Sequence, residues 1–362
     1  MTTAPVTQLT EALQFQIKSD EEILDRVFQK ETFSGTDLAV ARFSNCRFEQ
    51  CRFEQCDLRE SVFATCQFSD SQFIRCDFES SQWLKNEFTR CLFTESDLKQ
   101  NQWLACEWLH SQFNKTNFLH ASFEQNSLEQ CQFTGCHFEH TTFFESDLTQ
   151  CSSTDGMTER LSLYQCKMHP FPFTEERLAK LLIAEADLTG VDFAKRDLSM
   201  TQFMDCILNN IRADGATLVQ TNLSGCKLNK AQMNGVQATG VLMSGCELND
   251  ATLNNSQLDQ ASFQNAQMNR TQLKNCRLEM SQLSDVQLQQ ADLANSVLTY
   301  SDLSNANLYQ AVLTGCELTR CNLHNVKVED TDWTGSNKQD ALPTDEKRLK
   351  AALWQKPSAR QH

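Results

Sequence analysis

The stretch SNCRFEQCRFEQCDL, residues 44–58, contains the pattern that organises most of the chain. A large apolar residue recurs every five positions (Phe48, Phe53, Leu58), and a cysteine stands two positions before each. The same phase runs from Phe28 to Trp333, where 58 of the 62 central positions hold a large apolar residue. Neither the 3.6-residue period of a helix nor the 2-residue period of a strand describes this pattern. We therefore expect a repeat protein whose central residue and preceding small residue both face the interior.

Cysteine is used as part of this repeat. All 17 cysteines occupy the small-residue position, and no two of them are spaced as CxxC. Zinc ribbons need such closely spaced pairs, so the cysteines are interpreted as small buried hydrophobes. The sequence predicts no metal site, no cofactor and a reducing, cytoplasmic location.

Charge and motifs exclude several classes of function. The net charge of -15 argues against direct nucleic-acid binding, because few cations are present to neutralise phosphates. There is neither an apolar run of about 20 residues for a membrane helix nor a secretory signal at the N-terminus. GxSxG, HExxH and a phosphate-binding glycine loop are all absent from the sequence. We expect no catalytic residues and no enzyme activity.

The five-residue pattern resembles the A(D/N)LXX repeat of the pentapeptide-repeat family. The family's fold is a right-handed quadrilateral β-helix in which four repeats, or 20 residues, form one coil, so the resemblance implies an all-β solenoid. With that coil length, two sets of aromatic residues should stack between coils: Phe33, Phe53, Phe73, Phe93, Phe113 and Phe133, and Phe43, Phe63, Trp83, Trp103, Phe123 and Phe143.

Changes in composition suggest five segments. We expect an N-terminal cap with short helical pieces (1–27), a Phe- and Cys-rich first β-helix (28–150), a joint (151–186), a Leu-, Asn- and Gln-rich second β-helix (187–335), and a linker with a C-terminal helix (336–362). The joint is predicted to be a degraded coil followed by a short helix, since Thr174 is a plausible N-cap and Leu178, Leu181 and Leu182 have helical spacing. Asn and Gln side chains should form ladders between coils of the second β-helix.

An acidic column is the most regular polar feature. Aspartates precede central positions at 20-residue intervals: Asp37, Asp57, Asp77 and Asp97. They are part of the family pattern, yet they could also mimic a phosphate backbone and steer a basic partner. Arg59 and Lys99 lie nearby in the sequence and should soften the repulsion between the carboxylates.

Apolar residues at outward positions form a second candidate. These are Ile74, Leu84, Leu92, Leu104, Leu109 and Leu119. A contiguous group of them would be a docking patch, whereas isolated exposed leucines are ordinary. His120 and His140 should stack on neighbouring coils close to His137, as solvated side chains rather than metal ligands.

The C-terminal segment has two expected roles. A helix at about 345–355, with Thr344 as its cap, carries the apolar stripe Leu349, Leu353 and Trp354. It either closes the last coil or dimerises two chains, and the resemblance favours dimerisation because a C-terminal helix has that role in gyrase-interacting members of the family.

The function predicted from these features is a non-enzymatic interaction scaffold or adaptor for a protein partner of unknown identity. One alternative is a DNA mimic that binds DNA gyrase, as in the quinolone-resistance members. Another is an accessory adaptor or chaperone of a bacterial type VI secretion apparatus, which rests on family-level analogy alone.

Overall fold

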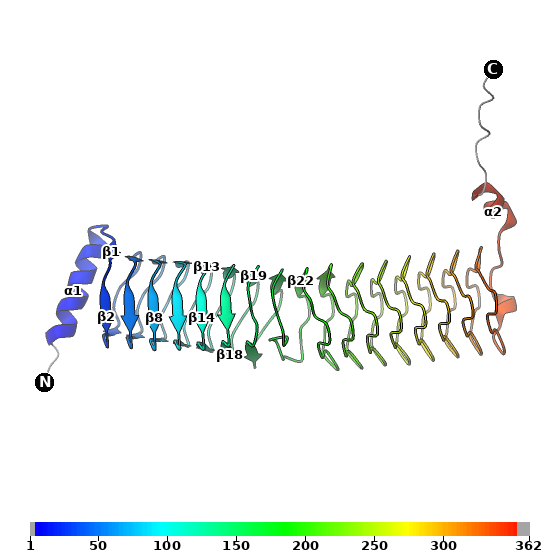
Figure 1. The fold of residues 1–362 in the computed structure, drawn as a ribbon, viewed down its shortest axis with the longest axis horizontal. Coiled ribbons are helices and arrows are strands. Elements are labelled where there is room, and N and C mark those ends of the chain that lie inside the picture. The colour runs from blue at the N-terminus through cyan, green and yellow to red at the C-terminus, as the bar shows by residue number, and fades with distance from the viewer. Residues whose placement is uncertain (1–3, 353–362) are drawn as a thin grey trace, which may run out of the picture. The chain divides into compact units, whose positions relative to one another are not determined.

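The computed structural model describes residues 4–352, which form a parallel all-β solenoid followed by a short C-terminal helix (Figure 1). The chain divides into two compact units. Unit 1 comprises the residues up to 191 together with 196–202, and unit 2 comprises 192–195 together with the residues from 203 onward. Within 4–352, no helix is long and apolar enough to cross a membrane.

Most five-residue repeats share one local geometry. Cys46 and Phe48 are buried, whereas Arg47 between them is exposed. The last residue of a repeat has a left-handed backbone, as at Gln50 with φ of 55°. This conformation costs an L-residue about 1–2 kcal/mol. Hydrogen bonds between coils, such as Gln50 N–H to the Ser69 carbonyl (2.8 Å), and burial of the central side chain offset that cost.

Unit 1 is paired in a 20-residue register, so that four repeats make one coil. Phe33 pairs with Phe53, and Phe43 with Phe63, in parallel strands. The first repeat of each coil forms sheet A, with strands β1 (Ile23–Leu24), β4 (Arg42–Ser44), β7 (Val62–Ala64), β10 (Gln82–Leu84), β13 (Gln102–Leu104), β16 (Ser122–Glu124), β19 (Thr142–Phe144), β21 (Ser162–Tyr164) and β22 (Leu182–Ala184).

The second and third repeats form two further sheets, and the fourth pairs through single bridges. Sheet B contains β2 (Val27–Gln29), β5 (Arg47–Glu49), β8 (Gln67–Ser69), β11 (Glu87–Thr89), β14 (Glu107–Leu109) and β17 (Ser127–Glu129). Sheet C contains β3 (Thr32–Ser34), β6 (Arg52–Glu54), β9 (Gln72–Ile74), β12 (Leu92–Thr94), β15 (Gln112–Asn114), β18 (Gln132–Thr134) and β20 (Ser152–Thr154). The fourth repeats pair through bridges such as Asp57↔Asp77.

Stacked aromatic rings fill the core of unit 1. Phe53 stacks on Phe73 at 4.8 Å, and Trp83 stacks on Trp103 at 4.5 Å between ring centroids. Both predicted sets of rings stack in this way throughout. The stacking follows from the spacing of about 4.8 Å between paired strands, which brings rings in register into contact. This confirms the two predicted columns.

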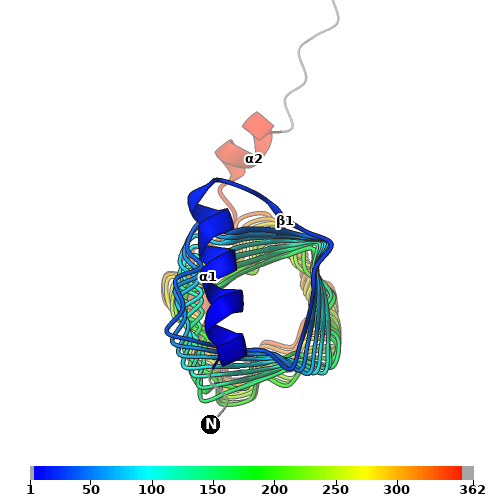
Figure 2. The ribbon, with the colours of Figure 1, turned by 90° about the vertical axis from the view of Figure 1, so that its left-hand side faces the viewer.

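A single helix, α1 (Ala4–Lys18), lies across the N-terminal end of unit 1 (Figures 1 and 2). Its Leu13 side chain is buried. The expectation of short helical pieces over residues 1–27 was therefore wrong in two respects. The helix is continuous, and the first coil already begins at Ile23, which is buried and pairs with Phe43.

The helix predicted within the joint at 151–186 does not form. Residues 182–184 are strand β22, paired with β21 in the same register. Leu178 and Ile183 are also five residues apart, and both are fully buried as central residues. The five-residue pattern prevails because a helix here would leave the edge of the neighbouring coil unpaired. Thr174, the predicted N-cap, instead donates its hydroxyl to the Ser153 carbonyl (2.7 Å).

Unit 2 keeps the 20-residue register through single bridges, for example Arg212↔Gln232. Strand β23 (Gln202–Met204) lies where unit 1 passes into unit 2 in the sequence. The predicted amide ladders are present. Asn229 Oδ1 accepts the backbone N–H and the side-chain amide of Asn249 (both 3.1 Å), and Asn249 Oδ1 accepts the N–H of Asn269 (3.1 Å).

The chain after residue 335 is more ordered than a linker. A 3-10 helix, η1 (Lys338–Asp340), precedes Leu342, which pairs with Asn322 as part of the last coil. Helix α2 (Glu346–Ala352) follows. Its cap is Asp345, which accepts the N–H groups of Lys347 and Arg348, and not Thr344 as predicted, because the Thr344 hydroxyl accepts the Asn325 N–H instead.

Candidate protein-docking surfaces

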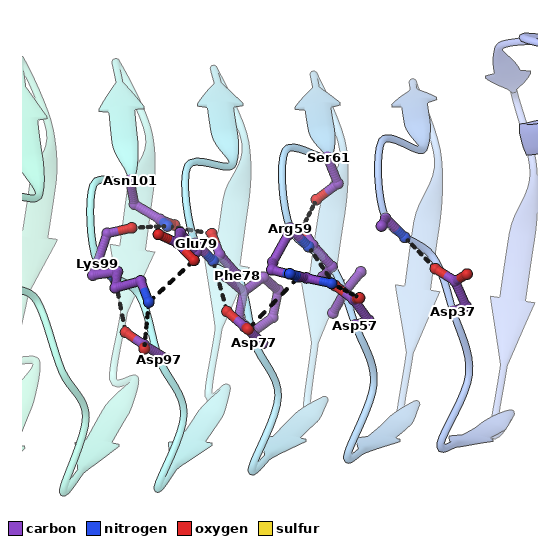
Figure 3. Close-up of polar contacts among 12 residues, drawn as sticks. Asp37, Asp57, Arg59, Ser61, Asp77, Phe78, Glu79, Asp97, Lys99 and Asn101 are labelled. Atoms are coloured by element: carbon purple, nitrogen blue, oxygen red, sulfur yellow. Dashed lines mark hydrogen bonds and ion pairs between the residues drawn. The ribbon is translucent and has the colours of Figure 1, made fainter.

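The four aspartates of the predicted acidic column lie in register on the fourth repeats of neighbouring coils (Figure 3). In each of them, Oδ1 accepts the backbone N–H of the residue two positions later, at 3.0–3.1 Å. This is the turn that Asp and Asn side chains favour. Each aspartate therefore has a structural role within its own repeat.

Cations are interleaved with these carboxylates. Arg59 donates to both carboxylate oxygens of Asp57 (2.9 and 2.6 Å), and its Nε lies 3.8 Å from Asp77 (Figure 3). The Arg59 guanidinium holds the pKa of Asp57 below its usual value. Lys99 contacts Glu79 at 3.0 Å and Asp97 at 3.6 Å. The column is thus a network of ion pairs rather than an uninterrupted line of negative charge.

The predicted apolar candidates are spread over all four repeats of the coil. Ile74 and Leu92 lie on sheet C, Leu109 on sheet B, and Leu119 on a fourth repeat. The residues are close together in the sequence, but the coil places them on different sides of the solenoid. The six residues therefore do not form one contiguous patch.

Leu84 and Leu104 are brought together. They end β10 and β13 on sheet A, are register partners, and are 39% and 38% exposed. Ala64 precedes Leu84 in the same column. We name the surface formed by Val62, Ala64, Leu84, Leu104 and Ala105 the sheet A patch. Lys85 is the only charged residue among the three sheet A repeats at 61–65, 81–85 and 101–105.

The sequence analysis missed the continuation of this column. Beyond Glu124, the rings of Phe144 and Tyr164 stack at 5.2 Å with an interplanar angle of 4°. The Tyr164 hydroxyl donates to Glu185 (2.6 Å), and this bond lowers the pKa of the Glu185 carboxyl. The signal was available, because residues 64, 84, 104, 144 and 164 are separated by multiples of the 20-residue coil.

The histidines form a stack without metal-binding geometry. The rings of His120 and His140 lie 4.9 Å apart, and Arg160 Nη1 lies 3.1 Å from His140 Nε2. His137 instead faces Glu139 at 3.3 Å. Within 4–352, no group of three or more His, Cys, Asp or Glu side chains is arranged to hold a metal ion.

Burial suppresses most of the thiols as nucleophiles. All 17 cysteines are buried. Burial raises the pKa of Cys106 and of Cys136 to about 11. Since the thiolate is the reactive form, these groups are inert near neutral pH.

The terminal helix is connected to the last coil of unit 2. The Asp345 N–H donates to His324 Nδ1 (3.1 Å), and the Thr344 hydroxyl accepts the N–H of the next residue of that coil, Asn325 (3.1 Å). Leu349 is half-buried. Leu353 and Trp354, the other members of the predicted stripe, lie outside the described residues.

Comparison with solved structures finds several partial similarities. HetL from Nostoc sp. strain PCC 7120, involved in heterocyst differentiation regulation, is 20% identical with a TM-score of 0.46, over 59% of this chain and 91% of HetL. Rfr23 from Cyanothece 51142 is 28% identical with a TM-score of 0.23, over 27% of this chain and 64% of Rfr23. QnrB1, a plasmid-mediated fluoroquinolone resistance protein, is 16% identical with a TM-score of 0.34, over 63% of this chain and 92% of QnrB1.

Family membership rests on sequence models rather than on these structures. A search of curated proteins found no match. A model of the pentapeptide repeat region matches residues 27–103. A model of eight pentapeptide repeats matches residues 111–150, 206–245, 242–279 and 281–320. These matches together cover more than half of the chain and agree with its buried five-residue lattice. The chain belongs to the pentapeptide repeat family.

Proposed function

We propose that this chain is a non-enzymatic scaffold that binds a protein partner on the sheet A patch. The observation that carries the proposal is the pairing of Leu84 and Leu104, two exposed leucines held side by side on neighbouring strands. Their backbone is fixed by the coil register, so binding orders little of the scaffold and loses little conformational entropy. The burial of all 17 cysteines supports a role without an exposed thiol nucleophile.

Three finer features belong to the same proposal. A four-sided coil is supported by the four repeats in each 20-residue turn, and a right-handed one by the hand that connections between parallel strands take. A cytoplasmic location is supported by the use of 17 cysteines as small buried residues, which a reducing compartment preserves. Dimerisation through α2 is proposed as a separate property, since Leu349 remains only half-buried against the rest of its own chain.

A comparison of captured proteins tests the docking proposal. Wild-type protein, the double variant Leu84→Ser/Leu104→Ser and the single variant Leu109→Ser would each be used to capture proteins from the native host, followed by quantitative mass spectrometry. Leu109 is a matched control, because it is 38% exposed but lies on sheet B. We expect at least one protein to be retained by wild type and Leu109→Ser and lost by the double variant. Identical captured sets would reject the sheet A patch as an interface.

The contacts around the acidic column do not favour a DNA mimic. Arg59 and Lys99 place positive charge between the aspartates, at 2.6–3.8 Å from carboxylate oxygens. A phosphate backbone has no such alternation. We therefore keep gyrase binding as an alternative to be tested rather than as a second proposal.

A further inference from the structure

The sheet A patch has the dimensions and the charge surroundings that fit one kind of partner. We infer that it binds an amphipathic α-helix of a protein partner, which lies along the direction in which the coils stack. This inference rests on the proposed docking function and deepens it. The helix would place three apolar side chains over Ala64, Leu84 and Leu104.

Spacing is the first argument. Paired strands lie about 4.8 Å apart, so the column Ala64, Leu84, Leu104 advances by about 4.8 Å per residue. An apolar seam on a helix recurs every 3.5 residues on average, or about 5.3 Å. The mismatch is about 0.5 Å per coil and reaches only about 1 Å over the three coils. A helix therefore stays in register along this column but would drift out of register on a much longer one.

Width is the second argument. A three-residue strand such as β10 or β13 spans about 10 Å. An α-helix with its side chains is about 10–12 Å across. One helix therefore covers one repeat side. The column is flanked on one side by Val62, Gln82 and Gln102 and on the other by Thr65, Lys85 and Ala105, so its flanks are small or polar and carry a single charge.

Charge is the third argument, and it specifies the ends of the helix. Carboxylates stand at both ends of the column. On one side Ser44 donates its hydroxyl to Glu22, while the neighbouring Arg42 is already paired with Asp20 (2.8 Å), so this end keeps an excess of negative charge. On the other side the next residue of the column is the exposed Glu124. The three sheet A repeats that form the patch carry only one charged residue, Lys85. A complementary helix has an uncharged apolar centre and basic residues near both of its ends.

Sheets B and C of unit 1 lack this combination of an apolar column and few charges. On sheet C, Arg52 and Arg75 both pair with Glu54. On sheet B, Arg90 pairs with Asp70. Leu109 stands between Thr89 and Glu129 in its column. An apolar seam placed on either sheet would desolvate these charged groups without compensation.

A peptide of defined composition tests the inference. The probe is a fluorescent peptide of about 18 residues, or about five helical turns, with three leucines on one face, alanine and glutamine elsewhere, and lysines at both ends. Binding to full-length protein is measured by anisotropy at two salt concentrations, and helix formation by circular dichroism. The controls are the same peptide with a central proline and the protein variants Leu104→Glu and Leu109→Glu.

We expect saturable binding, a gain of helix on binding, and an affinity at least about tenfold lower for Leu104→Glu, as loss of one buried leucine contact implies. Leu109→Glu should bind as wild type does, and the proline peptide should not bind. Absence of binding, equal loss in both variants, or equal binding of the proline peptide would overturn the inference.

Two further outcomes separate the possible occupants. If the protein alone forms dimers that Leu104→Glu abolishes, the patch is covered by a second copy and the helix inference is rejected. If the peptide fails while proteins captured from the host still depend on Leu84 and Leu104, the docking proposal stands and only the helix inference is lost.

Discussion

Neighbouring tryptophans on sheet A differ in how their buried polar atoms are satisfied. Trp83 Nε1 donates to the Ser81 hydroxyl (2.7 Å) and to Asn101 Oδ1 (3.1 Å). Trp103 is stacked on Trp83 and equally buried, but its Nε1 has no hydrogen-bond partner within residues 4–352. The two side chains therefore contribute differently to the free energy of unfolding although they are equally buried, because an unsatisfied buried donor costs about 1–3 kcal/mol.

The substitutions Trp83→Phe and Trp103→Phe should separate these two cases. Both remove a similar ring area, but the first also breaks hydrogen bonds while the second removes an unsatisfied N–H. We expect Trp83→Phe to lower the free energy of unfolding by about 2 kcal/mol more than Trp103→Phe. Urea denaturation followed by circular dichroism measures the difference. Equal losses would contradict the argument.

Buried thiols make stability depend on pH in the alkaline range. Burial raises the pKa of Cys106, Cys136 and Cys166 from 9.0 to about 11. Between about pH 9 and pH 11 the unfolded chain loses these protons while the folded chain keeps them, so the unfolded state is favoured as pH rises.

We therefore expect the urea midpoint to be constant between about pH 6 and pH 8 and to fall between about pH 9 and pH 11. Native protein at pH 8 should react with a thiol reagent only as fast as it unfolds. Rapid modification of several thiols in folded protein, or a midpoint that rises above pH 9, would show that the cysteines are not buried as neutral groups.

At the scale of elements, α1 covers one end of the solenoid and its two faces differ sharply. Leu13 is 1% exposed, whereas Phe15, two residues later on the same helix, is 69% exposed. A repeat stack needs its terminal coil covered, because the edge otherwise offers unpaired backbone groups to other chains.

The variant Leu13→Asp should release α1, whereas Phe15→Asp should leave it in place. Burying a carboxylate without a partner costs several kcal/mol, which exceeds the contribution of one helix face. We expect faster amide exchange over β1 and β4 and self-association in Leu13→Asp, measured by hydrogen exchange and light scattering. Matching behaviour of the two variants would show that α1 does not protect the first coil.

The segment 174–186 shows how one apolar pattern satisfies two periods. Leu178, Leu181 and Leu182 have helical spacing, but Leu178 and Ile183 also occupy central positions of the five-residue lattice, and Leu181 occupies a small-residue position. All three lattice positions are buried. The neighbouring coil favours the strand over the helix, because only a strand at 182–184 can pair with β21.

At the scale of the whole molecule, the net charge of -15 has no simple relation to function. Within the acidic column, negative charge is partly neutralised by Arg59 and Lys99. A strongly acidic surface keeps a repeat protein soluble and steers basic partners, but it does not by itself imitate DNA.

We expect this protein to leave gyrase supercoiling unaffected. The variant carrying Asp→Asn at positions 37, 57, 77 and 97 should keep its fold, because each amide Oδ1 can accept the same backbone N–H as the aspartate does. A supercoiling assay and circular dichroism of both proteins measure this. Inhibition by wild type that disappears in the quadruple variant would instead establish a DNA mimic.

The sequence by itself determined the solenoid, the inward direction of the cysteines and the two aromatic columns. The inward direction of the cysteines follows from the strict five-residue period, and a one-residue slip would expose every central residue from Phe28 onward. The solenoid and the two aromatic columns also needed the 20-residue coil that the resemblance to the pentapeptide-repeat family implies. The acidic column was equally visible, but its ion pairs required the positions of the Arg59 and Lys99 side chains.

Only the tertiary structure decided which outward residues meet. Leu84 and Leu104 are 20 residues apart in the sequence and lie side by side on sheet A. Leu104 and Leu109 are only five residues apart, but they lie on different sheets. The start of the first coil at Ile23, the strand at Leu182–Ala184 and the cap at Asp345 were likewise settled by contacts with neighbouring coils. The physical reason is that the five-residue period alone predicts whether a residue is buried. Neighbours on the surface, in contrast, come from different coils, so the pairing of coils decides which residues meet.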